Sequence, residues 1–301
     1  MINCSIGIMA YNEEANIGRL LEALLAQETN TVHIGEIVVV ASGCTDRTEQ
    51  IVTGFIGRDR RIRLIRQMQR EGKASAVNLF LRNVYNEIVT LISADTLPLP
   101  GAIEALVSPF ADPGIGMVGG RPVPTNPSGT LFGYGVHLLW ELHHQVSLRS
   151  PKMGELIAFR NIFRQIPHDS AVDEASIEPL IVGQGLCLHY AAQAIVRNRG
   201  PETMRDFIEQ RRRIFAGHLY VKSTLGYTVS TLGGLRIAWL FIKSFRGLHQ
   251  PWQWRYLLWA PVIIALEVYV RLLATCDYVI WKRKPYKWIV AESTKDLAEV
   301  S

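Results

Sequence analysis

Short apolar runs alternate with amphipathic stretches through the first third of the chain. Between residues 14 and 27, apolar side chains recur at i, i+3, i+4, i+7 and i+8, the spacing of one helix face. Those side chains are Ile17, Leu20, Leu21, Leu24 and Leu25. The pattern predicts strands at 3–10, 36–41, 61–66 and 87–93 and helices at 14–27, 45–56 and 73–84. Strands that alternate with helices are typical of parallel βαβ units, so we expect an α/β fold.

The pattern is less regular after Gly120. A proline-rich stretch at 121–128 (RPVPTNPS) breaks the alternation, and we expect a loop that leads into a helix at 130–149. The sequence then predicts extended segments at 155–160 and 186–191 and helices at 173–181 and 202–217. The sequence shows no internal repeat and no low-complexity tract.

The last quarter of the chain carries two apolar segments with basic residues between them. Residues 235–247 predict a short helix, and residues 256–281 form a run long enough to span a bilayer. However, Glu267, Arg271 and Asp277 interrupt the longer run, and each charge would cost about 2–3 kcal/mol at the bilayer centre. Glu267 and Arg271 stand at i and i+4, where they can pair. A spanning helix, an interfacial or re-entrant helix and a helix packed on the preceding domain are the alternatives, and we favour the interfacial anchor.

The net charge of +5 is concentrated in this C-terminal part. Residues 201–288 carry 14 Lys and Arg against 5 Asp and Glu, whereas the other residues carry 18 against 22. The basic side chains are interleaved with Trp, Tyr and long apolar runs, a combination that suits an anionic lipid surface. Nucleic acid fits less well, because these runs would interrupt a basic binding face. We therefore expect a membrane surface, and no nucleic acid, as a partner.

Composition narrows the class and the compartment. Of 301 residues, 48% are hydrophobic and 20% are charged, which indicates a folded chain with a substantial core. The four cysteines have no CxxC spacing and suggest neither a zinc site nor a disulfide framework. The N-terminus enters a strand-like run without a basic region or cleavage site, so we expect no secretory signal. These features favour a reducing compartment on the cytoplasmic side of a membrane.

Polar residues follow three of the expected strands at the point where each strand ends. Tyr11 and Glu13 follow the first strand, Ser42 and Asp46 follow the second, and Asp95 follows the fourth. In an open α/β sheet, ligands bind outside the carboxyl ends of the strands. The pattern alone therefore predicts a binding site at this edge of the sheet.

Four short segments occur in a fixed order within this pattern: residues 10–14 (AYNEE), 93–95 (SAD), 173–174 (DE) and 210–214 (QRRRI). Together they resemble the motifs of family 2 glycosyltransferases of the GT-A fold, and the resemblance covers residues 3–220. It implies a GT-A, Rossmann-like nucleotide-sugar-binding domain with a mainly parallel central sheet. We therefore expect this domain at 1–225 and a helical, membrane-associated segment at 226–301.

The resemblance assigns the nucleoside pocket to the segments after the first two strands. It implies that the nucleotide contacts Ala10, Tyr11, Glu13, Ser42 and Asp46. Where many family members carry an acidic pair, this chain has Ala41 and Ser42, so the nucleobase stays open. Residues 11–13 also fit a plain strand-to-helix turn with Asn12 as a cap. Lys73 stands in a stretch that resembles the family's Gly-Lys-Ala segment and is expected to reach a phosphate, the alternative being a solvated lysine.

A divalent cation usually balances the diphosphate leaving group in GT-A enzymes, at an Asp-x-Asp motif. Mg²⁺ and Mn²⁺ prefer carboxylate and phosphate oxygens. Residues 93–95 resemble this motif, but Ser93 replaces the first acid. We expect Asp95 to bind the metal and Ser93 to contact the sugar or the nucleotide. The alternative is that Asp95 caps the turn before Pro98.

An inverting transfer needs a carboxylate beside the acceptor hydroxyl, on the face opposite the leaving group. The family places an acidic pair after the metal motif, and Asp173 with Glu174 occupies that place. The family's more common order is Glu-Asp, and in that register Glu174 is the base, with Asp173 as the other candidate. Both acids also suit a helix N-terminus electrostatically, which is the alternative explanation.

Residues 210–214 resemble the family's Gln-x-x-Arg-Trp motif, with Ile214 in place of Trp. Gln210 and Arg213 stand at i and i+3 on one helix face, and Arg suits bidentate contact with a diphosphate. The missing Trp removes an aromatic surface for an acceptor sugar, which argues against a chain-extending polysaccharide synthase. Glu155 lies in a stretch that resembles another family segment near the acceptor. The alternative for the three arginines is a basic face towards lipid headgroups.

The resemblance implies an inverting, metal-dependent transfer of a sugar from a nucleotide-diphosphate donor to an acceptor hydroxyl. The basic, aromatic C-terminal segment favours a lipid or lipid-linked acceptor at the cytoplasmic membrane face. A sugar-phosphate nucleotidyltransferase would need a glycine-rich loop where this chain has residues 11–14 (YNEE). A non-catalytic nucleotide-sugar-binding or scaffold protein is the second alternative, because the Asp-x-Asp motif is incomplete and the Trp is missing.

Overall fold

The computed structural model describes residues 1–168, 172–229 and 254–282. The strands are β1 (Ile2–Ala10), β2 (Val32–Ser42), β3 (Ile62–Gln67), β4 (Ile88–Ser93), β5 (Thr96–Pro98), β6 (Ile115–Pro124), β7 (Leu156–Arg160) and β8 (Cys187–Asn198). The helices are α1 (Ile17–Leu25), α2 (Thr48–Ile56), α3 (Lys73–Arg82), α4 (Ala102–Val107), α5 (Leu131–Ser147), α6 (Asp173–Val182), α7 (Met204–Leu225) and α9 (Trp254–Thr275). A 3₁₀ turn, η1 (Ser108–Ala111), follows α4, and a π-helical turn, η3 (Cys276–Ile280), follows α9.

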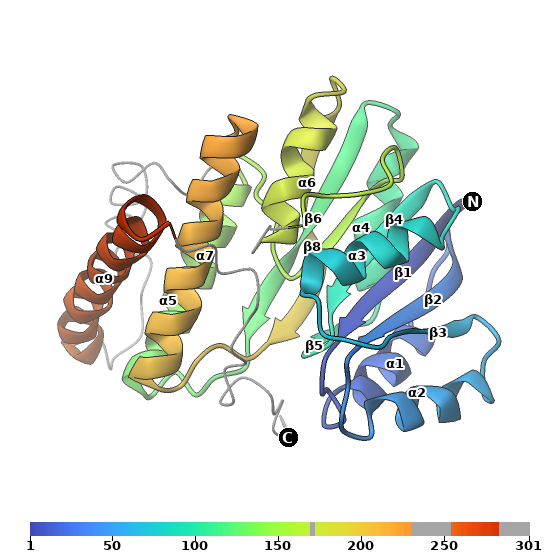
Figure 1. Ribbon diagram of the computed structural model, residues 1–301, viewed down its shortest axis with the longest axis horizontal. Coiled ribbons are helices and arrows are strands. Elements are labelled where there is room, and N and C mark those ends of the chain that lie inside the picture. Colours follow the sequence, from blue (N-terminus) through green and yellow to red (C-terminus); the bar gives the residue numbers. More distant parts are fainter. Residues whose placement is uncertain (169–171, 230–253, 283–301) are drawn as a thin grey trace.

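The strands form one eight-stranded sheet in the order β3-β2-β1-β4-β7-β6-β8-β5 (Figure 1). The first half, from β3 to β4, is parallel throughout. In the second half, β7 runs antiparallel to both β4 and β6, β8 is parallel to β6, and β5 is antiparallel to β8. The predicted α/β class is confirmed: the sheet is mixed, and its parallel half lies where the alternation of strands and helices predicted it.

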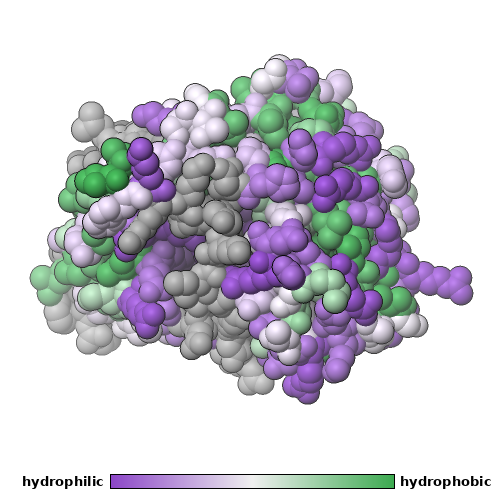
Figure 2. All heavy atoms as spheres, viewed as in Figure 1, coloured by the Kyte–Doolittle hydropathy of each residue, from purple (hydrophilic) through white to green (hydrophobic). Residues whose placement is uncertain are grey.

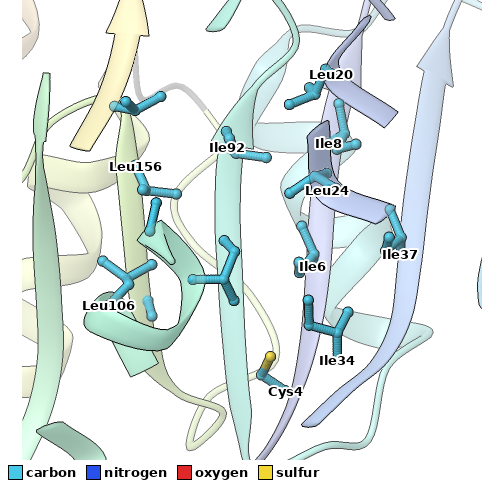
Figure 3. Packing of buried hydrophobic residues seen from close by; sticks show 14 of the residues in the cluster. Cys4, Ile6, Ile8, Leu20, Leu24, Ile34, Ile37, Ile92, Leu106 and Leu156 are labelled. Atoms are coloured by element: carbon cyan, nitrogen blue, oxygen red, sulfur yellow. The ribbon is translucent and has the colours of Figure 1, made fainter. Parts of the chain in front are cut away.

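Helices cover both faces of the parallel half, and each face has its own hydrophobic core. On one face α1, α2 and α4 pack on inward residues of β1 and β2, such as Ile6, Ile8 and Ile37 (Figure 3). On the other face α3 and α6 pack against β2, β4 and β7. Gly7 permits the close approach of α3, because a Cβ there would lie 2.8 Å from carbons of the Phe80 ring. These cores fix the strand ends that carry the site.

The strands and helices predicted for the described part of the chain are present, and β8 and α7 run further than expected. The pattern missed β5, α4 and the first part of β6. The prediction of a loop at 121–128 was wrong for its first four residues. β6 continues to Pro124 and pairs there with β8 alone, from Arg121↔Ile195 to Pro124↔Asn198. A strand without a partner on one side tolerates proline, which has no N–H to donate.

The C-terminal helix α9 lies beside α7 and α5 (Figure 1). Ile263 approaches α5 so closely that a Cβ on Gly135 would meet it at 2.7 Å. The expected Glu267 and Arg271 pair is present at 3.8 Å. By length and composition alone, Leu258–Ile280 is long and apolar enough to cross a membrane. The helix predicted at 235–247 lies outside the described residues. The four cysteines form no disulfide bond in this structure.

Candidate active site

A cavity of about 640 Å³ opens at the carboxyl ends of β1, β2 and β4. Every site residue expected from the sequence except Asp46 lines it. These residues are Ala10, Tyr11, Glu13, Ser42, Lys73, Ser93, Asp95, Glu155, Asp173, Glu174, Gln210 and Arg213. Segments that are far apart in the sequence therefore converge on one enclosed volume, and α7 and α9 form its far wall through residues such as Arg211 and Glu267.

Asp46 does not line the cavity, and its contacts are those of a loop-fixing residue. Its carboxylate accepts hydrogen bonds from the backbone N–H groups of Glu14 and Thr48, each at 3.0 Å. It also accepts from the Thr48 hydroxyl at 2.6 Å. These bonds tie the turn after β1 to the start of α2. Asp46 thus supports the nucleoside side of the site from outside the cavity.

The turn after β1 presents Tyr11 to the cavity. Asn12 adopts a left-handed backbone conformation with a φ of 51°, and its side-chain oxygen accepts from the Thr45 N–H at 2.8 Å. Asn12 therefore braces this turn against the next loop, and Asn16, not Asn12, stands at the N-cap of α1. The Arg70 guanidinium lies 3.9 Å from the centre of the Tyr11 ring. A tyrosine with a stacked arginine offers both a flat surface and positive charge to a nucleotide.

Ser42 ends β2 and lines the cavity. Its hydroxyl donates to Gln67 Oε1 at 2.6 Å, and Gln67 Nε2 donates to the Glu71 carboxylate at 2.8 Å. Glu13 lies opposite, with its backbone N–H donating to Thr48 and its carboxylate accepting from Asn16 at 3.2 Å. The nucleoside end of the cavity thus combines the hydroxyl of Ser42 with the charged side chains of Glu13 and Arg70, all of which line it.

Lys73 and Asp173 form an ion pair on the cavity wall, with Lys73 Nζ 3.0 Å from Asp173 Oδ1. Asp173 is buried at the first turn of α6. Burial alone would lower the pKa of Lys73, but the carboxylates of Asp173, Glu174 and Glu155 outweigh it and raise that pKa. Lys73 is therefore a fixed positive charge at the start of α3, and the solvated alternative for it is wrong.

Glu174, next to Asp173, lies in a different electrostatic setting. Burial and the neighbouring charge of Asp173 raise the pKa of Glu174 to about 8, although Lys73 opposes the shift. A carboxyl with a pKa in this range can take up and release a proton near neutral pH. Both acids do stand at a helix N-terminus, as the alternative explanation required. An electrostatic role at the helix N-terminus does not by itself explain why both acids also line the cavity.

Ser93, Asp95 and Glu155 meet where β4 ends and β7 begins. The Ser93 hydroxyl donates to Glu155 Oε2 at 3.0 Å. Burial raises the pKa of Glu155, and the nearby Asp95 raises it further. Within residues 1–168, 172–229 and 254–282, no group of three or more His, Cys, Asp or Glu side chains is arranged to hold a metal ion. A cation at Asp95 would therefore share its coordination sphere with oxygens of a bound diphosphate, and hard carboxylate oxygen is the donor that Mg²⁺ or Mn²⁺ prefers.

The three arginines of α7 all line the cavity, but their partners differ. Arg213 lies on the cavity side, where burial lowers its pKa and the carboxylates led by Glu155 and Glu174 oppose the shift. Arg211 pairs with Glu267 of α9 at 3.1 Å through Nη2, and Arg212 pairs with Asp277. The idea of one basic face towards lipid is therefore wrong, because these side chains bind carboxylates of the protein.

Sequence patterns missed several basic side chains and histidines of the cavity wall, among them Arg70, Lys152 and His143. Arg70 stacks on Tyr11, and Lys152 lies beside the Gly154-Glu155 segment. Burial lowers the pKa of Lys152, while Glu178 opposes the shift. Burial and Lys152 lower the pKa of His143 to about 3, so His143 is neutral. Arg70 and Lys152 each lie a few residues before a segment that resembled a family motif. That proximity was the feature of the sequence that could have pointed to them.

Sequence comparisons match parts of the chain to known proteins. The family described as Glycosyl transferase family 2 matches residues 5–177, more than half of the chain. The chain is 28% identical over 102 residues to the glycosyltransferase GlyG of Streptococcus pneumoniae serotype 4, covering 34% of this chain and 33% of that protein. It is 31% identical over 93 residues to a dolichyl-phosphate beta-glucosyltransferase of Trichomonas vaginalis, covering 29% and 28%. The alignments thus span about a third of the length of these curated relatives.

Solved structures share the fold over most of the chain. The mannosyltransferase PcManGT from Pyrobaculum calidifontis, in complex with GDP-Man and Mn²⁺, is similar with a TM-score of 0.65 and 20% identity, over 93% of this chain and 87% of that chain. Glucosyl-3-phosphoglycerate synthase from Mycobacterium tuberculosis, in complex with Mn²⁺ and UDP-Glc, is similar with a TM-score of 0.53 and 21% identity, over 75% and 79%. At such identities the likeness establishes the fold. With the sequence match over more than half of its length, the chain belongs to glycosyl transferase family 2 and has a GT-A-like fold.

Proposed function

We propose that the protein transfers a hexosyl group from a nucleotide-diphosphate sugar to an acceptor hydroxyl. The observation that carries this proposal is that Asp95, Asp173 and Glu174 share one cavity with Lys73 and Arg213. The arrangement combines a candidate base with fixed charges for a diphosphate, in a volume of about 640 Å³ that suits a small ligand. Family membership, and the donors GDP-Man and UDP-Glc in the related structures, support this class of donor.

The reaction that fits these groups is a single displacement with inversion. Glu174 takes the proton of the acceptor hydroxyl while the acceptor oxygen forms a bond to the anomeric carbon. The bond from that carbon to the diphosphate oxygen breaks, and the electron pair leaves with the nucleoside diphosphate. A pKa of about 8 suits Glu174 to this task, because a general base is most effective when its pKa lies near the operating pH. Asp173 keeps Lys73 in position beside it.

The departing diphosphate is balanced by groups on three sides of the cavity. Lys73 reaches it from the start of α3, and Gln210 and Arg213 reach it from α7. When bound, Mg²⁺ or Mn²⁺ would add positive charge at Asp95 and so stabilise the leaving group. The oxygen ligands available at Asp95 fit such an ion, and Mn²⁺ accompanies the donor in both related structures.

The nucleoside end lies at the turn after β1. Tyr11, with Arg70 stacked on its ring, offers a surface for the base, and the hydroxyl of Ser42 and the backbone at Ala10 lie on the same wall. Glu13 and Ser93 complete the polar lining towards the sugar. These contacts support a nucleotide without selecting the nucleobase.

We propose that the acceptor is a lipid or lipid-linked sugar and that α9 rests on the cytoplasmic membrane face. α9 buries Ala260, Ile263 and Val270 against the rest of the protein. α9 and the residues that follow it expose a second set of apolar side chains, namely Leu258, Val262, Ile264, Val268, Tyr269 and Leu272 on α9 and Val279, Ile280 and Trp281 beyond it. Hydrophobic surface is visible at the left edge of Figure 2, where Figure 1 shows α9. A dolichyl-phosphate glucosyltransferase among the relatives is compatible with a lipid acceptor.

The charges of α9 support an in-plane helix over a spanning one. Glu267 of α9 and Asp277 of the following turn η3 pair with Arg211 and Arg212 of α7, so the polar side of this C-terminal unit is held against the GT-A-like domain. A helix fixed in this way exposes only its apolar side to lipid, as interfacial helices do. We therefore propose that residues 1–225 form the catalytic domain and that 226–301 form its membrane-associated segment.

Nucleoside diphosphate release tests the activity. UDP-, GDP- and dTDP-sugars are each incubated with the protein and a membrane lipid extract, in Mn²⁺ or Mg²⁺ and again in EDTA. Metal-dependent, lipid-stimulated release from one donor would support the proposal, and E174Q should abolish it. Donor binding without release on any acceptor would instead favour a non-catalytic role, which the replacement of the first motif acid by Ser93 and of the motif Trp by Ile214 motivates.

Vesicle flotation tests the membrane contact. The full chain should float with vesicles that contain anionic lipid, and L258D or L272D should reduce the floating fraction, because both side chains are exposed on α9. Tyr85→Asp is the matched control, since Tyr85 is an exposed apolar residue on the α3–β4 turn. Equal flotation of all variants would contradict the proposed role of α9.

A further inference from the structure

Ser93 and Glu155 face each other where β4 and β7 pair. β4 ends at Ser93, β7 begins at Leu156, and Ile92 is paired with Leu156. The Ser93 N–H lies 3.4 Å from the Glu155 carbonyl oxygen, and the Ser93 hydroxyl donates to Glu155 Oε2 at 3.0 Å. Backbone pairing and a side-chain hydrogen bond therefore hold the Glu155 carboxylate against the hydroxyl of Ser93.

We propose that Glu155 supplies from β7 the carboxylate that Ser93 lacks, and that Glu155 and Asp95 together ligate the divalent cation of the donor diphosphate. The inference rests on the proposed function, because it assigns a ligand for the cation of that same reaction. In the Asp-x-Asp motif both acids stand on one strand end. Here the two carboxylates come from neighbouring strands and reach the same part of the cavity.

The charges at this spot support the assignment. Both carboxylates line the cavity, and the hydrogen bond from Ser93 holds the Glu155 carboxylate at a residue only two positions before Asp95 in the chain. Two like charges held close together repel each other, and a divalent cation between them converts the repulsion into attraction.

The ligand count also fits a shared cation. In the described ranges no three His, Cys, Asp or Glu side chains are arranged to hold a metal ion, so the protein offers no complete site of its own. Two carboxylates together with diphosphate oxygens and water form the mixed oxygen sphere that Mg²⁺ and Mn²⁺ accept. The cation would then bind tightly only with the nucleotide, which makes the contribution of each carboxylate measurable.

The test measures Mn²⁺ binding by electron paramagnetic resonance of the free ion, with the full-length protein and saturating UDP or GDP as probes. E155Q removes the charge but keeps an oxygen that can accept from Ser93. It should weaken Mn²⁺ binding about tenfold or more, since changes around a metal site typically cost 10–100-fold in affinity. The double variant S93D/E155Q returns a carboxylate to position 93 and should recover most of that loss. Glu141→Gln is the control and should bind like wild type, because Glu141 lies outside the cavity and pairs with Arg121.

The outcomes separate this inference from the proposed function. Wild-type affinity in E155Q would overturn the assignment of Glu155 while leaving the cation and the reaction in place. If S93D/E155Q binds Mn²⁺ no better than E155Q, the inference that Glu155 replaces a carboxylate at position 93 is wrong. If the wild-type protein binds UDP or GDP equally well in Mn²⁺ and in EDTA, the metal dependence in the proposed function fails, and the role of Glu155 fails with it. Thermal melting of each variant identifies any loss that comes from unfolding.

Discussion

Lys73 Nζ lies 3.0 Å from Asp173 Oδ1 and joins the first residue of α3 to the first residue of α6. The contact pairs the buried carboxylate of Asp173 with the partly buried ammonium group of Lys73. Glu174, its neighbour, has a pKa raised to about 8 by burial and by the charge of Asp173. The structure therefore separates two adjacent acids into a fixed charge and a group that can carry a proton near neutral pH.

We predict that E174Q lowers kcat about 10²–10⁴-fold, the usual contribution of a general base, with little change in KM for the donor. D173N should lower kcat less, because Asp173 acts by holding Lys73, and should lower thermal stability by breaking the ion pair. Steady-state kinetics of nucleoside diphosphate release measure both effects. If D173N, shown folded, loses more kcat than E174Q, the base is Asp173.

The activity should rise with pH through the pKa of the base. At saturating donor and acceptor, we expect kcat to be half-maximal near pH 8, because only ionised Glu174 accepts the proton. Lys73→Met should move this limb to higher pH, since the lysine charge lowers the pKa of Glu174. A pH profile measured for both proteins gives the comparison. An unshifted limb in the lysine variant would contradict the proposed coupling, whatever the change in absolute rate.

Local periodicity was enough to predict the parallel half of the sheet. In that half a helix joins β1 to β2 and β2 to β3, and both pairs are neighbours in the sheet, so the alternation of apolar runs and amphipathic stretches indicates their pairing. β4 follows β3 through α3 but pairs with β1, which the alternation does not reveal. β6 and β5 depend on pairing with β8, a strand that comes much later in the sequence. The prolines at 122 and 124 favoured the prediction of a loop. A strand tolerates proline only where one of its edges is unpaired, and that edge is visible only in the assembled sheet.

Motif order predicted most of the site, and three-dimensional partners explain the rest. Asp46 follows a strand as site residues do, yet its hydrogen bonds to the Glu14 and Thr48 backbone turn it away from the cavity. Arg211 and Arg212 looked like one basic face with Arg213, but carboxylates on α9 and on the following turn η3 bind them. Those partners are more than fifty positions away, so no local pattern could reveal them.

The raised pKa of Glu174 also predicts how stability depends on pH. The folded protein binds this proton more tightly than the unfolded chain, whose carboxyl has its ordinary pKa of 4.5. The resulting stabilisation is fully present below pH 4.5 and is lost as the pH rises through about 8.

The side chain introduced by E174Q cannot ionise, so the Tm of this variant relative to wild type should increase across this pH window. The increase should be about 2–4 °C for each kcal/mol of stabilisation that the wild type loses. Calorimetry at both ends of the window measures it, and a constant difference would contradict the shift. Glu141→Gln should show no such trend.

The ion pair between Arg211 of α7 and Glu267 of α9 should contribute to the docking of the C-terminal helix. Its side chains are partly buried and meet at 3.1 Å through Nη2, and Arg271 lies 3.8 Å from the same carboxylate. A double-mutant cycle with R211M and E267M should give a coupling of about 0.5–3 kcal/mol in the free energy of unfolding, because each single change leaves a half-buried charge without its main partner.

The exposed pair Arg205 and Glu209 on the same helix is the control, and its cycle should give about 0.3–0.5 kcal/mol. Chemical denaturation measures both cycles. Equal couplings would mean that apolar packing alone holds α9 against α7, and the argument for an in-plane helix would then rest on its exposed apolar side.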